Sequence, residues 1–135
     1  MFKKDKNNDK EILAAASLLL CIAKSDEKLD FDELNIVKDI ICDFFNITHS
    51  YQSIYDEALN DLKKSTDIYI YSKVLNETFS YIDKLDFINC IFEVAYIDGE
   101  LHYMEEYFIK KISKTLNVNN DDFIKCKMKI KKKMV

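Results

Sequence analysis

The stretch AYIDGELHYMEEY, residues 95–107, contains the only glycine of a chain that has no proline. A related stretch, AKSDEKLDFDELN at residues 23–35, stands 72 positions earlier and has Ala, Asp, Leu and Glu at the same spacings. Each stretch follows an apolar run and precedes an amphipathic one. Each therefore predicts two helices joined by a short acidic turn.

The correspondence extends beyond the two turns. At the same offset Leu13 pairs with Leu85, Leu20 with Phe92, Val37 with Ile109 and Ile40 with Ile112. After a slip of one residue, FNI at 45–47 corresponds to LNV at 116–118. We therefore predict repeat units at about 10–47 and 82–118. They lie within a single domain, residues 10–135, which follows a polar tail, residues 1–9.

The composition favours an all-α fold. With one Gly and no Pro, the chain lacks the turn residues that a β-sandwich or barrel needs, and 135 residues suit one domain with its own core. The run IYIY at 68–71 alternates like a strand, but a single strand would have no partner. Apolar spacing predicts a bundle of seven helices, which start near residues 8, 30, 50, 65, 80, 103 and 120. The first is expected to bury a stripe formed by Leu13, Ala16, Leu20 and Ala23, which Leu19 and Ile22 widen.

Charge is distributed unevenly along the chain. Residues 11–122 hold 22 acidic residues and 10 lysines, whereas 123–135 hold six lysines and no acidic residue. An acidic body is a poor surface for nucleic acid, and we interpret the Lys-rich end as a solvated helix terminus. Four cysteines without a C-x-x-C pair favour free thiols. Since no run has the length of a transmembrane segment or the pattern of a signal peptide, we expect a cytoplasmic protein.

The acidic turns supply the candidate site. Gly99 is expected to end the fifth helix in the left-handed region, and that helix is expected to reach Ile97. Glu33 and Glu105 stand where a capping box places its carboxylate. Asp26 and Asp98 have no such local role, because a carboxylate near a helix C-terminus opposes the helix dipole.

A divalent cation would explain carboxylates that have no local role. The string from Asp98 to Glu105 reproduces half of an EF-hand loop, but the first two ligand positions would be Val94 and Tyr96, so an ordinary EF-hand is excluded. Carboxylate oxygens suit Ca²⁺, Mg²⁺ or Mn²⁺ better than Zn²⁺. The candidate metal ligands are Asp26, Glu33, Asp98, Glu105 and Glu106.

An apolar helix that ends in Ala, followed by Asp-Gly-x-Leu-x-x-x-Glu and an amphipathic helix ending LNV, resembles the TerB domain of tellurite-resistance proteins. That domain also occurs beside the J-domain of DjlA-type co-chaperones. The resemblance covers about residues 10–125. It implies an all-helical fold with a clustered acidic surface that binds metal ions, and a role in stress or metal-resistance complexes without known catalysis.

Asp98, Gly99 and Glu105 match the turn of that family, and Glu106 suits its acidic continuation; in the first unit Glu27 stands where Gly is usual. Two functions follow. The first is a non-enzymatic domain that binds a divalent cation through its acidic turns. The alternative is a protein-interaction module, such as a co-chaperone or scaffold, whose carboxylates only cap helices. An enzyme is disfavoured because no nucleophile motif accompanies the two histidines.

Overall fold

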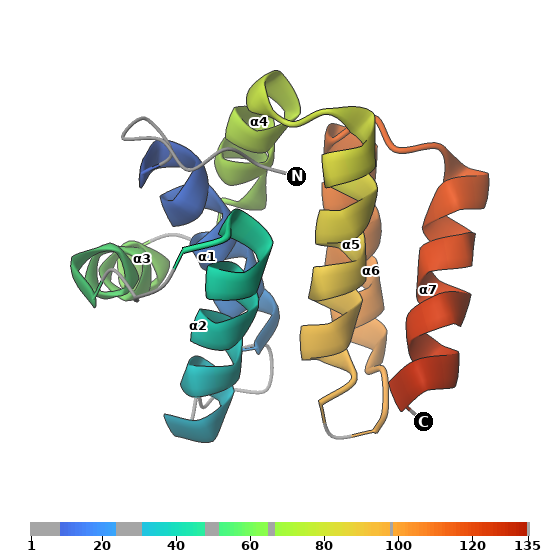
Figure 1. Cartoon of the computed structure of the whole chain (residues 1–135), viewed down its shortest axis with the longest axis horizontal. Coiled ribbons are helices and arrows are strands. Elements are labelled where there is room, and N and C mark those ends of the chain that lie inside the picture. The colour runs from blue at the N-terminus through green and yellow to red at the C-terminus, as the bar shows by residue number, and fades with distance from the viewer. Residues whose placement is uncertain (1–8, 24–30, 48–51, 65–66, 98, 135) are drawn as a thin grey trace.

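The computed structural model describes residues 9–23, 31–47, 52–64, 67–97 and 99–134. Within these ranges the chain forms seven helices and no strand, which confirms the all-α prediction (Figure 1). The helices are α1 (Asp9–Ala23), α2 (Phe31–Phe45), α3 (Gln52–Lys64), α4 (Ile68–Thr78), α5 (Tyr81–Ala95), α6 (Tyr103–Thr115) and α7 (Asn120–Met134). The alternating IYIY run is the start of α4, and Asp67 caps it by accepting a hydrogen bond from the backbone N–H of Tyr69 at 3.0 Å.

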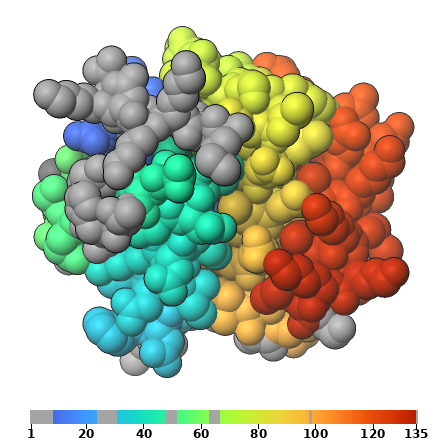
Figure 2. All heavy atoms as spheres, viewed as in Figure 1, coloured from blue at the N-terminus to red at the C-terminus, as the bar shows by residue number. Residues whose placement is uncertain are grey.

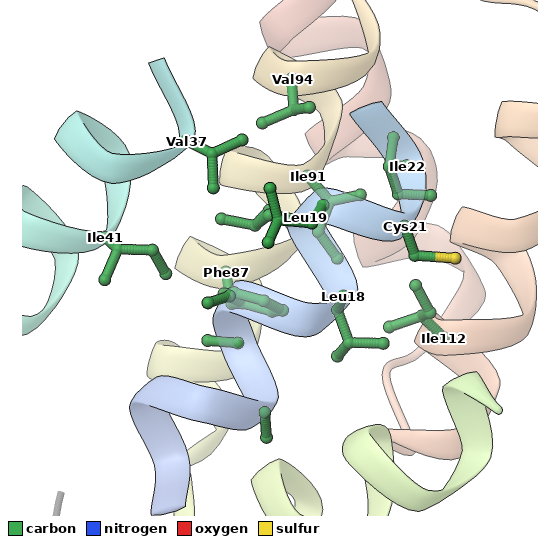
Figure 3. Close-up of a cluster of buried hydrophobic side chains, with 14 of the residues drawn as sticks. Leu18, Leu19, Cys21, Ile22, Val37, Ile41, Phe87, Ile91, Val94 and Ile112 are labelled. Atoms are coloured by element: carbon green, nitrogen blue, oxygen red, sulfur yellow. The ribbon is translucent and has the colours of Figure 1, made fainter. Parts of the chain in front are cut away.

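The first helix is the centre of the fold. It packs against α2, α3, α4, α5 and α6, and apart from Leu13 no residue from Ile12 to Ala23 is more than 8% exposed. The expected single apolar stripe was therefore too narrow, because neighbouring helices cover α1 on nearly every side. Figure 3 shows Leu18, Leu19 and Ile22 of α1 among Val37 and Ile41 of α2, Phe87 and Ile91 of α5, and Ile112 of α6.

The helix bounds repeat with the offset seen in the sequence. Helices α1 and α5 begin at Asp9 and Tyr81 and end at Ala23 and Ala95, so both of their ends keep this offset. The starts of α2 and α6, at Phe31 and Tyr103, keep it as well. In Figure 1 the N-terminal ends of α2 and α6 lie at the same end of the molecule, together with the turn from α5 to α6 and the C-terminal end of α7. The acidic first turns of α2 and α6 are therefore displayed at one end of the bundle.

The FNI and LNV sequences are equivalent helix ends. Asn46 and Asn117 adopt left-handed φ values of 55° and 59°. The next residues, Ile47 and Val118, each donate a backbone hydrogen bond to the carbonyl five residues earlier, at 2.9 and 3.0 Å. This is the Schellman motif, in which Asn is an accepted alternative to Gly. The slip of one residue between the units arises because the first unit has one more residue between its helix start and this asparagine.

The last helix covers one side of the second unit. Its buried residues, Phe123, Cys126 and Ile130, recur at helical spacing, and the ring of Phe123 lies 5.4 Å from that of Phe92 in α5. Figure 2 shows α2, α5 and α7 side by side on one face. The Lys-rich end is therefore part of the bundle, and α7 presents one flank to the turn between α5 and α6.

Candidate functional site at the turn between α5 and α6

The turn begins two residues earlier than its sequence suggests. Helix α5 ends at Ala95, and its C-cap Tyr96 accepts a hydrogen bond from the backbone N–H of Gly99 at 2.8 Å. The φ of Gly99 is +83°, so the expected left-handed conformation is confirmed. The expectation that α5 reaches Ile97 and that Gly99 terminates it is wrong. Because a tight turn follows the C-cap directly, Gly99 instead redirects the chain toward α6.

Glu105 is used to hold the start of α6. Its side chain is buried, with the residue only 6% exposed, and its Oε1 accepts a hydrogen bond from the backbone N–H of His102 at 3.0 Å. His102 is the N-cap, and Glu105 is the third helical residue, so the expected capping-box position is confirmed. The carboxylate also lies at the positive end of the helix dipole.

Glu106 forms an ion pair with the last helix. Its Oε2 lies 2.6 Å from Nζ of Lys127, and the side chains are 41% and 27% exposed respectively. The Lys-rich end was interpreted as a solvated helix terminus, but Lys127 within it forms this ion pair. A sequence signal existed, because Lys127 follows Cys126 on the helical face that also carries Phe123 and Ile130. The ammonium group neutralises a carboxylate that the sequence assigned to a cation.

A pocket of about 330 Å³ lies between the turn and α7. Its walls are formed by Tyr96, Gly99, Glu100, Leu101, Glu106, Lys127 and Lys131. Two carboxylates and two ammonium groups thus share one depression. A cation that enters it would have to compete with Lys127 for Glu106.

The other predicted ligands are placed as follows. Glu33 is half-buried in the first turn of α2, at the position that corresponds to Glu105. Asp26 and Asp98 lie outside the described residues. Among the residues that the structure does describe, no three His, Cys, Asp or Glu side chains form a group that could hold a metal ion. The five-residue ligand set therefore stays a prediction.

Three of the four thiols have a raised pKa. None of the four cysteines, all of which lie in the described ranges, forms a disulfide. Burial raises the pKa of Cys90 to about 12, with the Glu93 carboxylate adding to the effect, and burial also raises the pKa of Cys42 and of Cys126. Because the thiolate is the reactive form, these three side chains are poor nucleophiles at neutral pH.

The family model for tellurite resistance protein TerB matches residues 12–128, from the start of α1 into α7. The chain belongs to the TerB family. The resemblance found in the two acidic turns is thereby confirmed, and both partners of the Glu106–Lys127 pair fall within the matched TerB region. No curated protein and no solved structure matches the chain. In the described part of this TerB domain, none of the helices has both the length and the apolar character needed to cross a membrane.

Proposed function

We propose that this TerB domain is a non-catalytic module that recruits a protein partner, and that the carboxylates of its second acidic turn serve to hold the helices. One observation carries the proposal: α6 turns a carboxylate inward and large apolar side chains outward. Glu105 is 6% exposed, whereas Tyr103 is 82% exposed and Met104 and Tyr107 are each 48% exposed. A helix that is stabilised in this way offers its outer face to another molecule.

The family indicates the setting in which this partner acts. The matching family model carries the description tellurite resistance protein TerB. The partner is accordingly a component of a complex that protects the cell against tellurite or metal stress. The protonated thiols of Cys42, Cys90 and Cys126 fit a binding role better than a catalytic one.

A divalent cation at the acidic turns is the second candidate. It is favoured by Glu100 and Glu106, whose side chains line one pocket beside Gly99. Ca²⁺, Mg²⁺ or Mn²⁺ would draw on the carboxylates predicted from the sequence, namely Asp26, Glu33, Asp98, Glu105 and Glu106. On binding, the cation would take the place of the Lys127 ammonium beside Glu106.

Thermal melting separates the two candidates. A cation that binds only the folded state stabilises it by RT ln(1 + [L]/Kd), about 2.7 kcal/mol at a hundredfold excess over Kd. The interaction module is expected to melt alike in millimolar CaCl₂, MgCl₂ or MnCl₂ and in NaCl of the same ionic strength. A higher melting temperature in a divalent salt would replace the first candidate with the second. Asp98→Asn should then remove this increase in melting temperature. The control variant Asp67→Asn, which keeps a capping oxygen at α4, should still show the increase.

Complementation tests the interaction module directly. In a host that lacks this gene, tellurite tolerance is compared for the parent, Glu106→Gln and Tyr107→Ser. We expect Glu106→Gln to restore tolerance and Tyr107→Ser to fail, with both variants folded by circular dichroism. The opposite pattern would contradict the proposal. Unchanged tolerance on loss of the gene would contradict the tellurite setting.

A further inference from the structure

Of the ten large apolar side chains that are exposed in the described part of the chain, five lie on the last two helices. Tyr103, Met104 and Tyr107 belong to α6, and Ile124 and Met128, which are 47% and 55% exposed, belong to α7. We call these five residues the α6–α7 face. Apolar side chains that are exposed singly are ordinary on a protein surface, so their relative placement decides whether they form one surface.

The ion pair between Glu106 and Lys127 places them together. Tyr103 and Ile124 each stand three residues before their member of this pair, and Tyr107 and Met128 each stand one residue after it. In an α-helix these steps rotate a side chain by about 60° and about 100° in the same sense. Figure 1 shows that α6 and α7 run in opposite directions. Equal rotations on two antiparallel helices lead to the same side of the pair, so the four side chains share one face.

Lysines surround this face. Lys125 and Lys129 directly follow Ile124 and Met128 and are exposed on the side that turns away from α6. On α6, Lys111 and Lys114 continue the line of Tyr107 by one and two helical turns. The ammonium group of Lys111 lies 5.2 Å from the centre of the Tyr107 ring. The surface is thus apolar at its centre and positively charged at its margin.

Two carboxylates beside this face are engaged, and a third, Asp121, is exposed three residues before Ile124. Glu106 is paired with Lys127, and Asp122 in the first turn of α7 accepts a hydrogen bond from the hydroxyl of Tyr81 at 2.6 Å. Residues 11–122, which include α6 with Lys111 and Lys114, hold 22 acidic residues against 10 lysines. The four lysines at the margin outnumber the exposed Asp121, so the face favours an acidic partner.

We infer that the α6–α7 face binds an amphipathic helix of a partner protein, in which acidic residues flank an apolar stripe. This inference rests on the proposed function. The partner helix would lie across α6 and α7, both of which pack against α5, with its apolar stripe on the five apolar residues and its carboxylates paired with the lysines at the margin. The apolar residues are Tyr, Met and Ile, and Tyr and Met are enriched at protein interfaces. Trp, Phe and Leu, the usual residues of helices that lie on a bilayer, are not among them.

A designed peptide tests this inference. The probe is a fluorescein-labelled 18-residue helix with Leu along one stripe and Glu beside it, and the control probe has Lys in place of every Glu. Fluorescence anisotropy with the full chain should show at least tenfold tighter binding of the Glu peptide, because only its charges complement the lysine margin. Tyr107→Ser, Met128→Ser and Lys125→Glu should each weaken binding about tenfold. Phe31→Ser, a change at a residue of α2 that is 75% exposed, should leave binding unchanged.

Other occupants have separate outcomes. Equal binding of both peptides, or tight binding to phosphatidylserine vesicles that Met128→Ser abolishes, would overturn the inference in favour of a non-selective surface or a bilayer. Self-association in sedimentation that Met128→Ser removes would assign the face to a second copy of the chain. Absent peptide binding, together with failed complementation by Tyr107→Ser, would overturn the acidic helix but leave the proposed function standing. If Tyr107→Ser restores tolerance, the proposed function itself fails.

Discussion

Substitutions of Glu105 measure how much the acidic turn contributes to the stability of the fold. Glu105→Ala removes the acceptor for the His102 N–H and the negative charge at the start of α6. A helix N-terminal cap contributes about 1 kcal/mol, and a carboxylate at the positive end of a helix contributes about 0.5 kcal/mol more. The free energy of unfolding should therefore fall by about 1.5 kcal/mol, the sum of the two contributions. Glu105→Gln keeps an oxygen acceptor and should lose only the charge contribution, about 0.5 kcal/mol.

These values convert into melting temperatures through the size of the chain. Unfolding entropy is about 2.1 cal/mol/K per residue, or about 0.28 kcal/mol/K for this chain, so the expected decreases are about 5 °C for Ala and about 2 °C for Gln. Circular dichroism in EDTA measures both. The control is Glu57→Ala, which removes an exposed carboxylate from α3 and should change the melting temperature by less than about 2 °C.

Two outcomes would refute the reasoning. If Glu105→Gln is as destabilising as Glu105→Ala, the hydrogen bond to His102 contributes nothing and the charge alone matters. If neither variant differs from the parent in EDTA, Glu105 has no structural role in α6. A metal site would then become the better explanation of its burial.

Three further predictions concern other parts of the fold. Gly99→Ala should lower the free energy of unfolding by about 1 kcal/mol, because alanine is strained at a φ of +83°. An added Cβ would meet no atom within 4 Å, so the loss comes from the backbone alone. An unchanged melting temperature would contradict this prediction. Lys127→Ala should cost about 0.5–1 kcal/mol through the loss of its pair with Glu106. A double-mutant cycle with Glu106→Gln should recover that coupling, and strict additivity would show that the pair contributes nothing. Stability in urea should fall as pH rises from 9.0 toward about 12, because the folded state holds the Cys90 proton that the unfolded chain releases. Cys90→Ala should flatten this fall, and an equally steep fall in that variant would assign it to other groups.

The elements of the fold were accessible from the sequence because their determinants are local. Apolar spacing located all seven helices, and the offset between the two sequence units recurs in the bounds of α1 and α5. The solitary glycine has the left-handed conformation that its neighbours suggested. The extent of burial of α1 was missed, since an apolar stripe shows which face meets the core but not how many helices enclose it.

For the candidate site, the sequence by itself determined the capping position of Glu105, because a capping box joins groups within a single helical turn. Only the tertiary structure decided that Lys127, on the next helix, forms an ion pair with Glu106. This pairing depends on how α6 and α7 each pack against α5. Helix packing is set by side chains throughout the core rather than by the residues that meet at the surface, so a local pattern does not contain this pairing.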